Sequence, residues 1–147
     1  MNKLEWCKEK DKGIKIVEPN SNLAEKYIEK AEESLLTMEA TTSQEWKITA
    51  AYYTCYNSIY ALLQKTGIKS EIHSCTLELM KFYKFTESEK GYVKELKEDR
   101  INAQYHVTKE LELKSPSKVK DFLLKCKKML EETDFQEKRK KITKALK

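Results

Sequence analysis

The chain has 147 residues, of which 36% are charged and 39% hydrophobic, so we expect one ordered domain with its own core. Three glycines and two prolines leave few turns and favour long helices. No apolar run approaches the roughly 18 residues of a membrane span, and no hydrophobic signal region opens the chain, so we expect neither membrane insertion nor secretion.

The four cysteines are far apart in the sequence, and no pair has the C-x-x-C spacing. Only two histidines accompany them, so we expect no zinc site and no other metal or cofactor. Cys55 lies within an apolar helical pattern, which is typical of a buried, reduced thiol. The cysteine pattern therefore predicts a reducing, cytoplasmic location.

Residues 1–20 mix charges with Trp6 and a short apolar run that ends before Pro19. We interpret this segment as an N-terminal arm rather than a helix. The arm is expected to precede a helical domain over residues 21–135. Residues 136–147 then form a basic helix end or tail.

A first helix is predicted from about Asn22 to residue 39, because Asn is a good N-cap and Glu25 follows three residues later. Thr42 and Glu45 form the same pattern ahead of a second helix over about 44–66. That helix is apolar over much of its circumference, which indicates a central helix with neighbours on several sides. We interpret its tyrosines as core and interface residues: Tyr52, Tyr53, Tyr56 and Tyr60.

Gly67 follows the second helix, in the place where a glycine often ends a helix. A third helix follows His73, which we interpret as a helix N-terminal residue. Capping patterns open a fourth helix at Thr86, running through Val107, and a fifth at Ser115. Five helices with short connections predict an all-α fold, an antiparallel bundle.

Arg100 and His106 lie in the predicted fourth helix. Each helical residue turns about 100°, so these two are roughly 120° apart around the axis. Leu96, Ala103 and Val107 fall between them. A cation and an imidazole therefore flank an apolar stripe, and they would border whatever packs on it.

Four segments together resemble the HEPN family of small prokaryotic helical bundles. Residues 24–32 resemble its opening amphipathic helix, and residues 50–63 are similar to its tyrosine-rich central helix. Residues 67–74 resemble the loop before its third helix. Residues 100–106 resemble its late motif, in which an Arg is followed after four to six residues by His.

The resemblance implies a metal-independent endoribonuclease, with two protomers joining their motifs across a homodimer. Arg100 would hold the scissile phosphate and His106 would act as general base, while Asn102 would orient His106 or touch the phosphate. The toxin of a toxin–antitoxin pair is one such role, with a nucleotidyltransferase-like antitoxin as its partner. Residues 103–105 resemble a branch in which the His is often missing, so the catalytic hypothesis depends on His106.

Two alternatives remain open. Arg100 is also able to pair with nearby acids such as Glu95 or Asp99 as an ordinary surface residue. The whole protein would then be a non-catalytic dimeric interaction module that binds a nucleotidyltransferase-like partner or a nucleotide.

The C-terminal segment carries the whole net charge of +5, because residues 136–147 contain six Lys or Arg and one Glu. One hypothesis is a nucleic-acid-binding arm formed by Lys138, Arg139, Lys140 and Lys141. The other is a solvated helix end, where cations complement the helix dipole.

Overall fold

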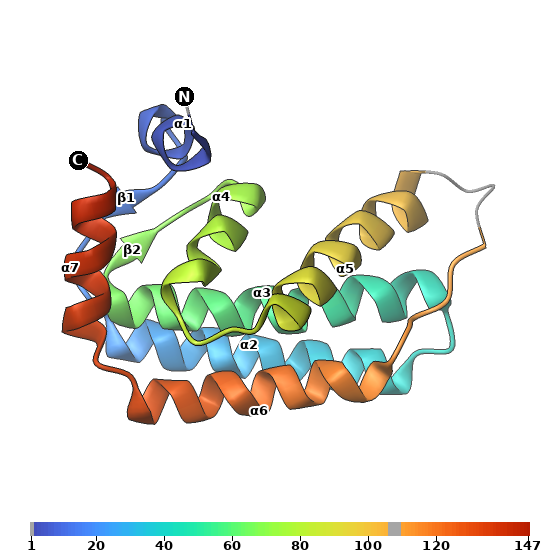
Figure 1. Cartoon of the computed structure of the whole chain (residues 1–147). Coiled ribbons are helices and arrows are strands. Elements are labelled where there is room, and N and C mark those ends of the chain that lie inside the picture. Colours follow the sequence, from blue (N-terminus) through green and yellow to red (C-terminus); the bar gives the residue numbers. More distant parts are fainter. Residues whose placement is uncertain (1, 106–109) are drawn as a thin grey trace.

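A computed structural model describes residues 2–105 and 110–147, which are mostly helical (Figure 1). The described residues form seven α-helices, a short 3-10 turn and a two-stranded sheet. In chain order these are α1 (Lys3–Glu9), β1 (Lys15–Ile16), α2 (Ser21–Ala40), α3 (Gln44–Thr66), β2 (Ile68–Lys69), α4 (His73–Glu78), the 3-10 turn (Leu79–Phe82), α5 (Glu87–Tyr105), α6 (Pro116–Glu132) and α7 (Phe135–Ala145).

Helix α3 lies at the centre, as its all-round apolar surface predicts. α2 runs antiparallel to it, α6 lies beside both, and α5 crosses α3 at an incline (Figure 1). Tyr52 and Ile59 of α3 are fully buried, which confirms the prediction of a central helix with neighbours on several sides. The all-α prediction is thus confirmed in outline, but the helices number seven rather than five.

Two helices begin one or two residues away from their predicted starts. Asn20, rather than Asn22, caps α2, because its side chain accepts the backbone N–H of Leu23 at 2.9 Å. Ser43, rather than Thr42, caps α3 in the same way. Neighbouring polar residues offer equivalent caps, so the sequence locates these helix starts only approximately.

Other predicted boundaries are confirmed. The Thr86 backbone N–H donates to the Glu89 carboxylate at 2.8 Å, and the Glu89 N–H donates to the Thr86 hydroxyl at 3.1 Å. Gly67 ends α3 with a φ of 89°, the left-handed conformation that glycine adopts without strain. Pro116 opens α6 after Ser115, although the Ser115 side chain makes no capping hydrogen bond.

The N-terminal segment is not the simple arm predicted. It forms α1, capped by Asn2 and Glu5, and then β1, which pairs antiparallel with β2. A disulfide between Cys7 and Cys75 joins α1 to α4. The partners are 68 residues apart in the chain, so no local pattern predicts this tertiary contact.

The other two cysteines, Cys55 and Cys126, are free and buried. Burial raises the pKa of each thiol, so both stay protonated near neutral pH. The prediction of a buried Cys55 thiol is therefore confirmed. The Cys7–Cys75 disulfide, however, differs from the fully reduced state that the cysteine spacing suggested.

The basic C-terminal segment is a separate helix rather than the end of α6. Thr133 ends α6, and the Asp134 side chain accepts the backbone N–H of Glu137 to begin α7. Ile142 packs fully into the core. α7 stands at the end of the bundle where both termini lie (Figure 1). None of the helices in the described residues is both long and apolar enough to cross a bilayer.

Candidate functional site

Arg100 lies where α5 crosses α3. Its Nη1 donates a hydrogen bond to the Tyr53 hydroxyl at 3.0 Å. Its Cζ lies 5.0 Å from the ring centroid of Tyr52 and 5.5 Å from that of Tyr53. Both distances fit a cation–π contact, which stabilises a guanidinium without neutralising its charge.

The guanidinium of Arg100 is only partly satisfied. It has five N–H donors, and among the described residues one hydroxyl accepts from it. Its Nε is buried and has no hydrogen-bond partner there. Buried donors are nearly always paired, so this arginine has unused capacity to hold an anion.

His73 lies in the same cluster, at the first position of α4. Its Nδ1 is 2.8 Å from the Tyr52 hydroxyl oxygen. Its ring stacks on Tyr56, with 4.1 Å between centroids and 16° between planes. Tyr52 thus contacts both Arg100 and His73, and links the cation of α5 to the imidazole of α4.

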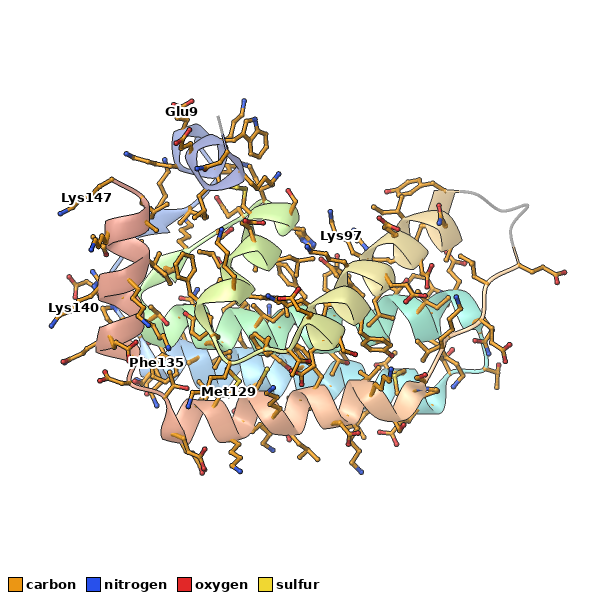
Figure 2. All side chains as sticks on the ribbon, viewed as in Figure 1. Glu9, Lys97, Met129, Phe135, Lys140 and Lys147 are labelled. Carbon is orange, nitrogen blue, oxygen red and sulfur yellow. A yellow bond between two sulfur atoms is a disulfide. The ribbon has the colours of Figure 1, made fainter. Side chains whose placement is uncertain are left out.

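The imidazole of His73 is neutral at pH 7. Its pKa lies below the ordinary 6.5, first because burial disfavours the charged form and then because the cations Arg100 and Lys97 are near. Burial raises the pKa of Tyr52, which therefore keeps its proton. Lys97 lies on the side of α5 that faces α4 (Figure 2).

Hydrogen bonds from α3 fix the position of α4. The Tyr56 hydroxyl pairs with Thr76 Oγ1 at 3.1 Å, and Tyr60 accepts the backbone N–H of Ser70 at 3.2 Å. One-turn spacing puts Tyr52, Tyr56 and Tyr60 on one side of α3, toward α4. The tyrosine row that we expected to serve the core therefore also positions His73.

The predicted partner of Arg100, His106, lies outside the described residues, as does Val107 of the predicted apolar stripe. Asn102 is half-buried on α5. Leu96 of the same stripe is buried in the core of its own chain, and Ala103 is half-buried. The structure therefore brings Arg100 together with His73 and the tyrosines, a grouping that the sequence analysis missed.

A signal for this grouping was present in the sequence. Adjacent tyrosines in a central helix, followed by a histidine just after a helix-ending glycine, place polar aromatic groups at one helix junction. The pattern does not say which later cation meets them, because that depends on the crossing of α5.

Arg139 does not have the open environment that the hypothesis of a nucleic-acid-binding arm requires. Its Nη1 donates to the backbone carbonyls of Val17 at 2.6 Å, Thr66 at 3.2 Å and Gly67 at 3.1 Å. These bonds satisfy carbonyls at the C-terminus of α3 and fasten α7 to the loop after β1. Arg139 therefore has a structural role in this fold.

Of the three neighbouring lysines, Lys138 is half-buried like Arg139. Lys138 Nζ lies 3.6 Å and Lys141 Nζ 2.8 Å from the Glu137 carboxylate. Lys140 and Lys141 are exposed, so they remain available to a polyanion. Among the described residues, no group of three or more His, Cys, Asp or Glu is arranged to hold a metal ion.

Comparisons of the chain with protein-family models, with curated proteins and with solved structures each find no match. The resemblance to the HEPN family therefore stays a prediction based on the quoted segments. Any functional assignment depends on the Arg100 cluster and on that resemblance.

Proposed function

We propose that this protein is a HEPN-like, metal-independent endoribonuclease that binds an RNA phosphate at Arg100. One observation carries the proposal: a partly satisfied guanidinium is held on tyrosine rings beside a neutral imidazole. A guanidinium binds phosphate oxygens through paired N–H groups and stabilises the charge of the transition state. A neutral imidazole is the form that accepts a proton.

The chemistry follows from these two groups. The imidazole takes the proton of the ribose 2′-hydroxyl, and the 2′-oxygen forms a bond to phosphorus. The bond from phosphorus to the 5′-oxygen breaks, and that oxygen takes a proton from water. The products carry a 2′,3′-cyclic phosphate and a 5′-hydroxyl. His106 is the base that the resemblance implies, and His73 is the imidazole that lies beside Arg100.

A cleavage assay in EDTA tests the proposal. Wild type is expected to cut a mixed-sequence RNA and to leave cyclic phosphate ends. His106→Ala and His73→Asn show which imidazole takes the proton, since loss of a general base lowers the rate about 10²–10⁴-fold. Lys120→Ala, an exposed substitution on α6, is the matched control. Absence of cleavage by wild type on every RNA tested would overturn the enzymatic function.

The second candidate is the non-catalytic, dimeric interaction module. Three large apolar side chains favour it, because they are strongly exposed: Leu36 at 67%, Trp46 at 54% and Tyr105 at 75%. They lie where α2 ends, α3 begins and α5 ends, which is one end of the molecule in Figure 1. Exposed apolar groups at one end of a protein are candidates for a contact surface.

A homodimer is part of both candidates, and a nucleotidyltransferase-like antitoxin is the proposed heterologous partner. Light scattering at micromolar concentration is expected to give twice the mass of one chain. Leu36→Asp is expected to favour the monomer if this end forms the interface, because a charge there would be desolvated. A monomer in wild type would contradict the dimer.

We also propose a cytoplasmic location. Glutathione keeps most thiols reduced in that compartment, so Cys7 and Cys75 are expected to be a dithiol there. Alkylation of intact cells followed by mass spectrometry measures this directly. A Cys7–Cys75 disulfide in freshly trapped protein would point instead to an oxidising compartment.

A further inference from the structure

A groove with a volume of about 330 Å³ runs between α2 and α3, next to the Arg100 cluster. Tyr53 belongs to both places, since it lines the groove while its hydroxyl accepts the hydrogen bond from Arg100. The other residues that matter here are Lys30 and Glu33 of α2, and Trp46, Thr49 and Asn57 of α3.

The α3 side of the groove presents aromatic rings along one helix face. Trp46, Tyr53 and Asn57 recur at spacings of seven and four residues, which places them in line along the helix. The Trp46 side chain is 54% exposed. A large aromatic residue left this open in a groove is a platform on which a flat ring can stack.

Thr49 supplies the second, independent observation. Its Oγ1 is buried and has no hydrogen-bond partner among the described residues. Helical hydroxyls usually donate to the carbonyl four residues earlier, as Thr54 does to Ala50 at 2.8 Å and Ser58 does to Thr54 at 2.6 Å. Since Thr49 lines the groove, rotation of its side chain would let this hydroxyl donate to a group bound there.

The charges of the groove select the kind of ligand. Lys30 and Glu33 are the charged residues that line it, and their opposite charges offset each other. The groove therefore suits a neutral, flat group with polar edges better than a phosphate. The cation that would bind a phosphate is Arg100, which contacts Tyr53 but does not line the groove.

We infer that the groove between α2 and α3 is a nucleobase subsite for the RNA strand whose phosphate binds at Arg100. The inference rests on the proposed function and adds a second contact to it. The base stacks on Trp46, and its polar edge meets the Thr49 hydroxyl and the Asn57 amide. Tyr53 separates the base from the phosphate and contacts the strand between them.

Tryptophan fluorescence tests this inference on the whole chain. The probe is a 2′-O-methyl hexanucleotide, which cannot be cleaved because its 2′-oxygen carries no proton. Its matched control is a 2′-O-methylribose-phosphate strand of the same length that lacks bases. The chain has two tryptophans, so the Trp6→Phe background assigns the signal to Trp46.

The expected result is quenching of Trp46 by the hexanucleotide and weaker binding of the abasic strand. Trp46→Ala is expected to weaken hexanucleotide binding about tenfold or more and to leave abasic binding unchanged. Thr49→Val is expected to weaken hexanucleotide binding while raising the melting temperature of the free protein, since it removes the unpaired hydroxyl. Leu124→Ala, about as exposed as Trp46 but on α6 and outside the groove lining, is the control.

The outcomes separate this inference from the proposed function. Equal binding of both strands, or an unaltered affinity in Trp46→Ala, would overturn the base subsite even if Arg100 is needed for cleavage. Hexanucleotide binding that depends on Trp46, in a protein that cleaves no RNA, would support the subsite and overturn the enzyme. Circular dichroism of each variant excludes misfolding as the cause.

Discussion

The chain has two arginines, and their environments differ sharply. Arg139 donates to three backbone carbonyls from two separate segments. Within residues 2–105 and 110–147, Arg100 donates to one tyrosine hydroxyl, lies over two aromatic rings and has an Nε without a partner. A guanidinium that donates to backbone carbonyls of two segments fixes the fold, whereas one held on aromatic rings keeps its charge available to an anion. The same residue type therefore has a structural role at one end and a proposed binding role at the other.

The largest expected effect is on cleavage by Arg100 variants. Arg100→Ala is expected to lower kcat/KM about 10²–10³-fold, the usual cost of losing one transition-state donor. Arg100→Lys should recover only part of this, because Lys keeps the charge but lacks the planar fork. Initial rates on one RNA measure both. Cleavage by Arg100→Ala at the wild-type rate would contradict the proposed binding role of Arg100.

Arg139 variants should show the opposite profile. Arg139→Ala removes the side-chain donor of three carbonyls, of which Gly67 keeps the Val17 N–H, and is expected to lower the free energy of unfolding by about 2 kcal/mol. Urea denaturation measures this loss. Cleavage per folded molecule should stay near wild type at low temperature. If Arg139→Ala is as stable as wild type but binds RNA more weakly, Arg139 binds nucleic acid rather than stabilising the fold.

The Cys7–Cys75 disulfide is expected to contribute about 2–4 kcal/mol to the stability of oxidised protein. Reductant should therefore lower the melting temperature of wild type and leave Cys7→Ser unaffected. Because Cys75 and His73 share α4, the same experiment shows whether the Arg100 cluster depends on α1. Equal melting temperatures in oxidised and reduced wild type would contradict the expected contribution.

The pKa of His73 gives a second test of the environment of Arg100. The fold lowers this pKa, so the unfolded chain binds more protons near pH 6, and the free energy of unfolding falls as the pH drops below about 6.5. Arg100→Ala should raise the His73 pKa only part of the way to 6.5, because burial is the larger cause. NMR titration of His106→Ala, in which His73 is the remaining histidine, measures it. An unaltered pKa would contradict the contact with Arg100.

The smallest effect concerns the lysines of α7. Lys140→Ala is expected to weaken RNA binding slightly and to lower the slope of log affinity against log salt by about one if it touches a phosphate. Lys120→Ala on α6 is the control. An unchanged slope would leave α7 with a structural role only.

Local patterns predicted the local structure well. The span of α3, the Thr86–Glu89 capping box and the glycine that ends α3 all depend on residues within a few positions of one another. The contacts that define the candidate site do not. Arg100 and Tyr53 are 47 residues apart, and Arg139 and Val17 are 122 apart. Such pairs depend on how helices cross, which no periodicity encodes.

The N-terminal segment shows the same limit. Its charges and short apolar run predict an arm, whereas the structure has the helix α1 there. This helix has only seven residues, and a disulfide and packing stabilise it rather than its own periodicity. His73 was interpreted as a helix N-terminal residue, and it is one. Its hydrogen bond with Tyr52, which places the imidazole in the Arg100 cluster, is a contact that the position in the sequence does not predict.

The Arg139 contacts also have a consequence for the order of events on the ribosome. The loop after β1 is synthesised early, yet the donor that its Val17 carbonyl binds lies on α7. Helices α2 and α3 can pair as soon as both have left the exit tunnel, because their contacts are near in the chain. The β1–β2 pairing also needs no residue beyond 69, but the hydrogen bonds of Arg139 to Val17 and Thr66 form only after α7 has been made. A nascent chain stalled before residue 139 is therefore expected to have a protease-resistant helical hairpin and a loop after β1 that is cleaved faster than in the full chain.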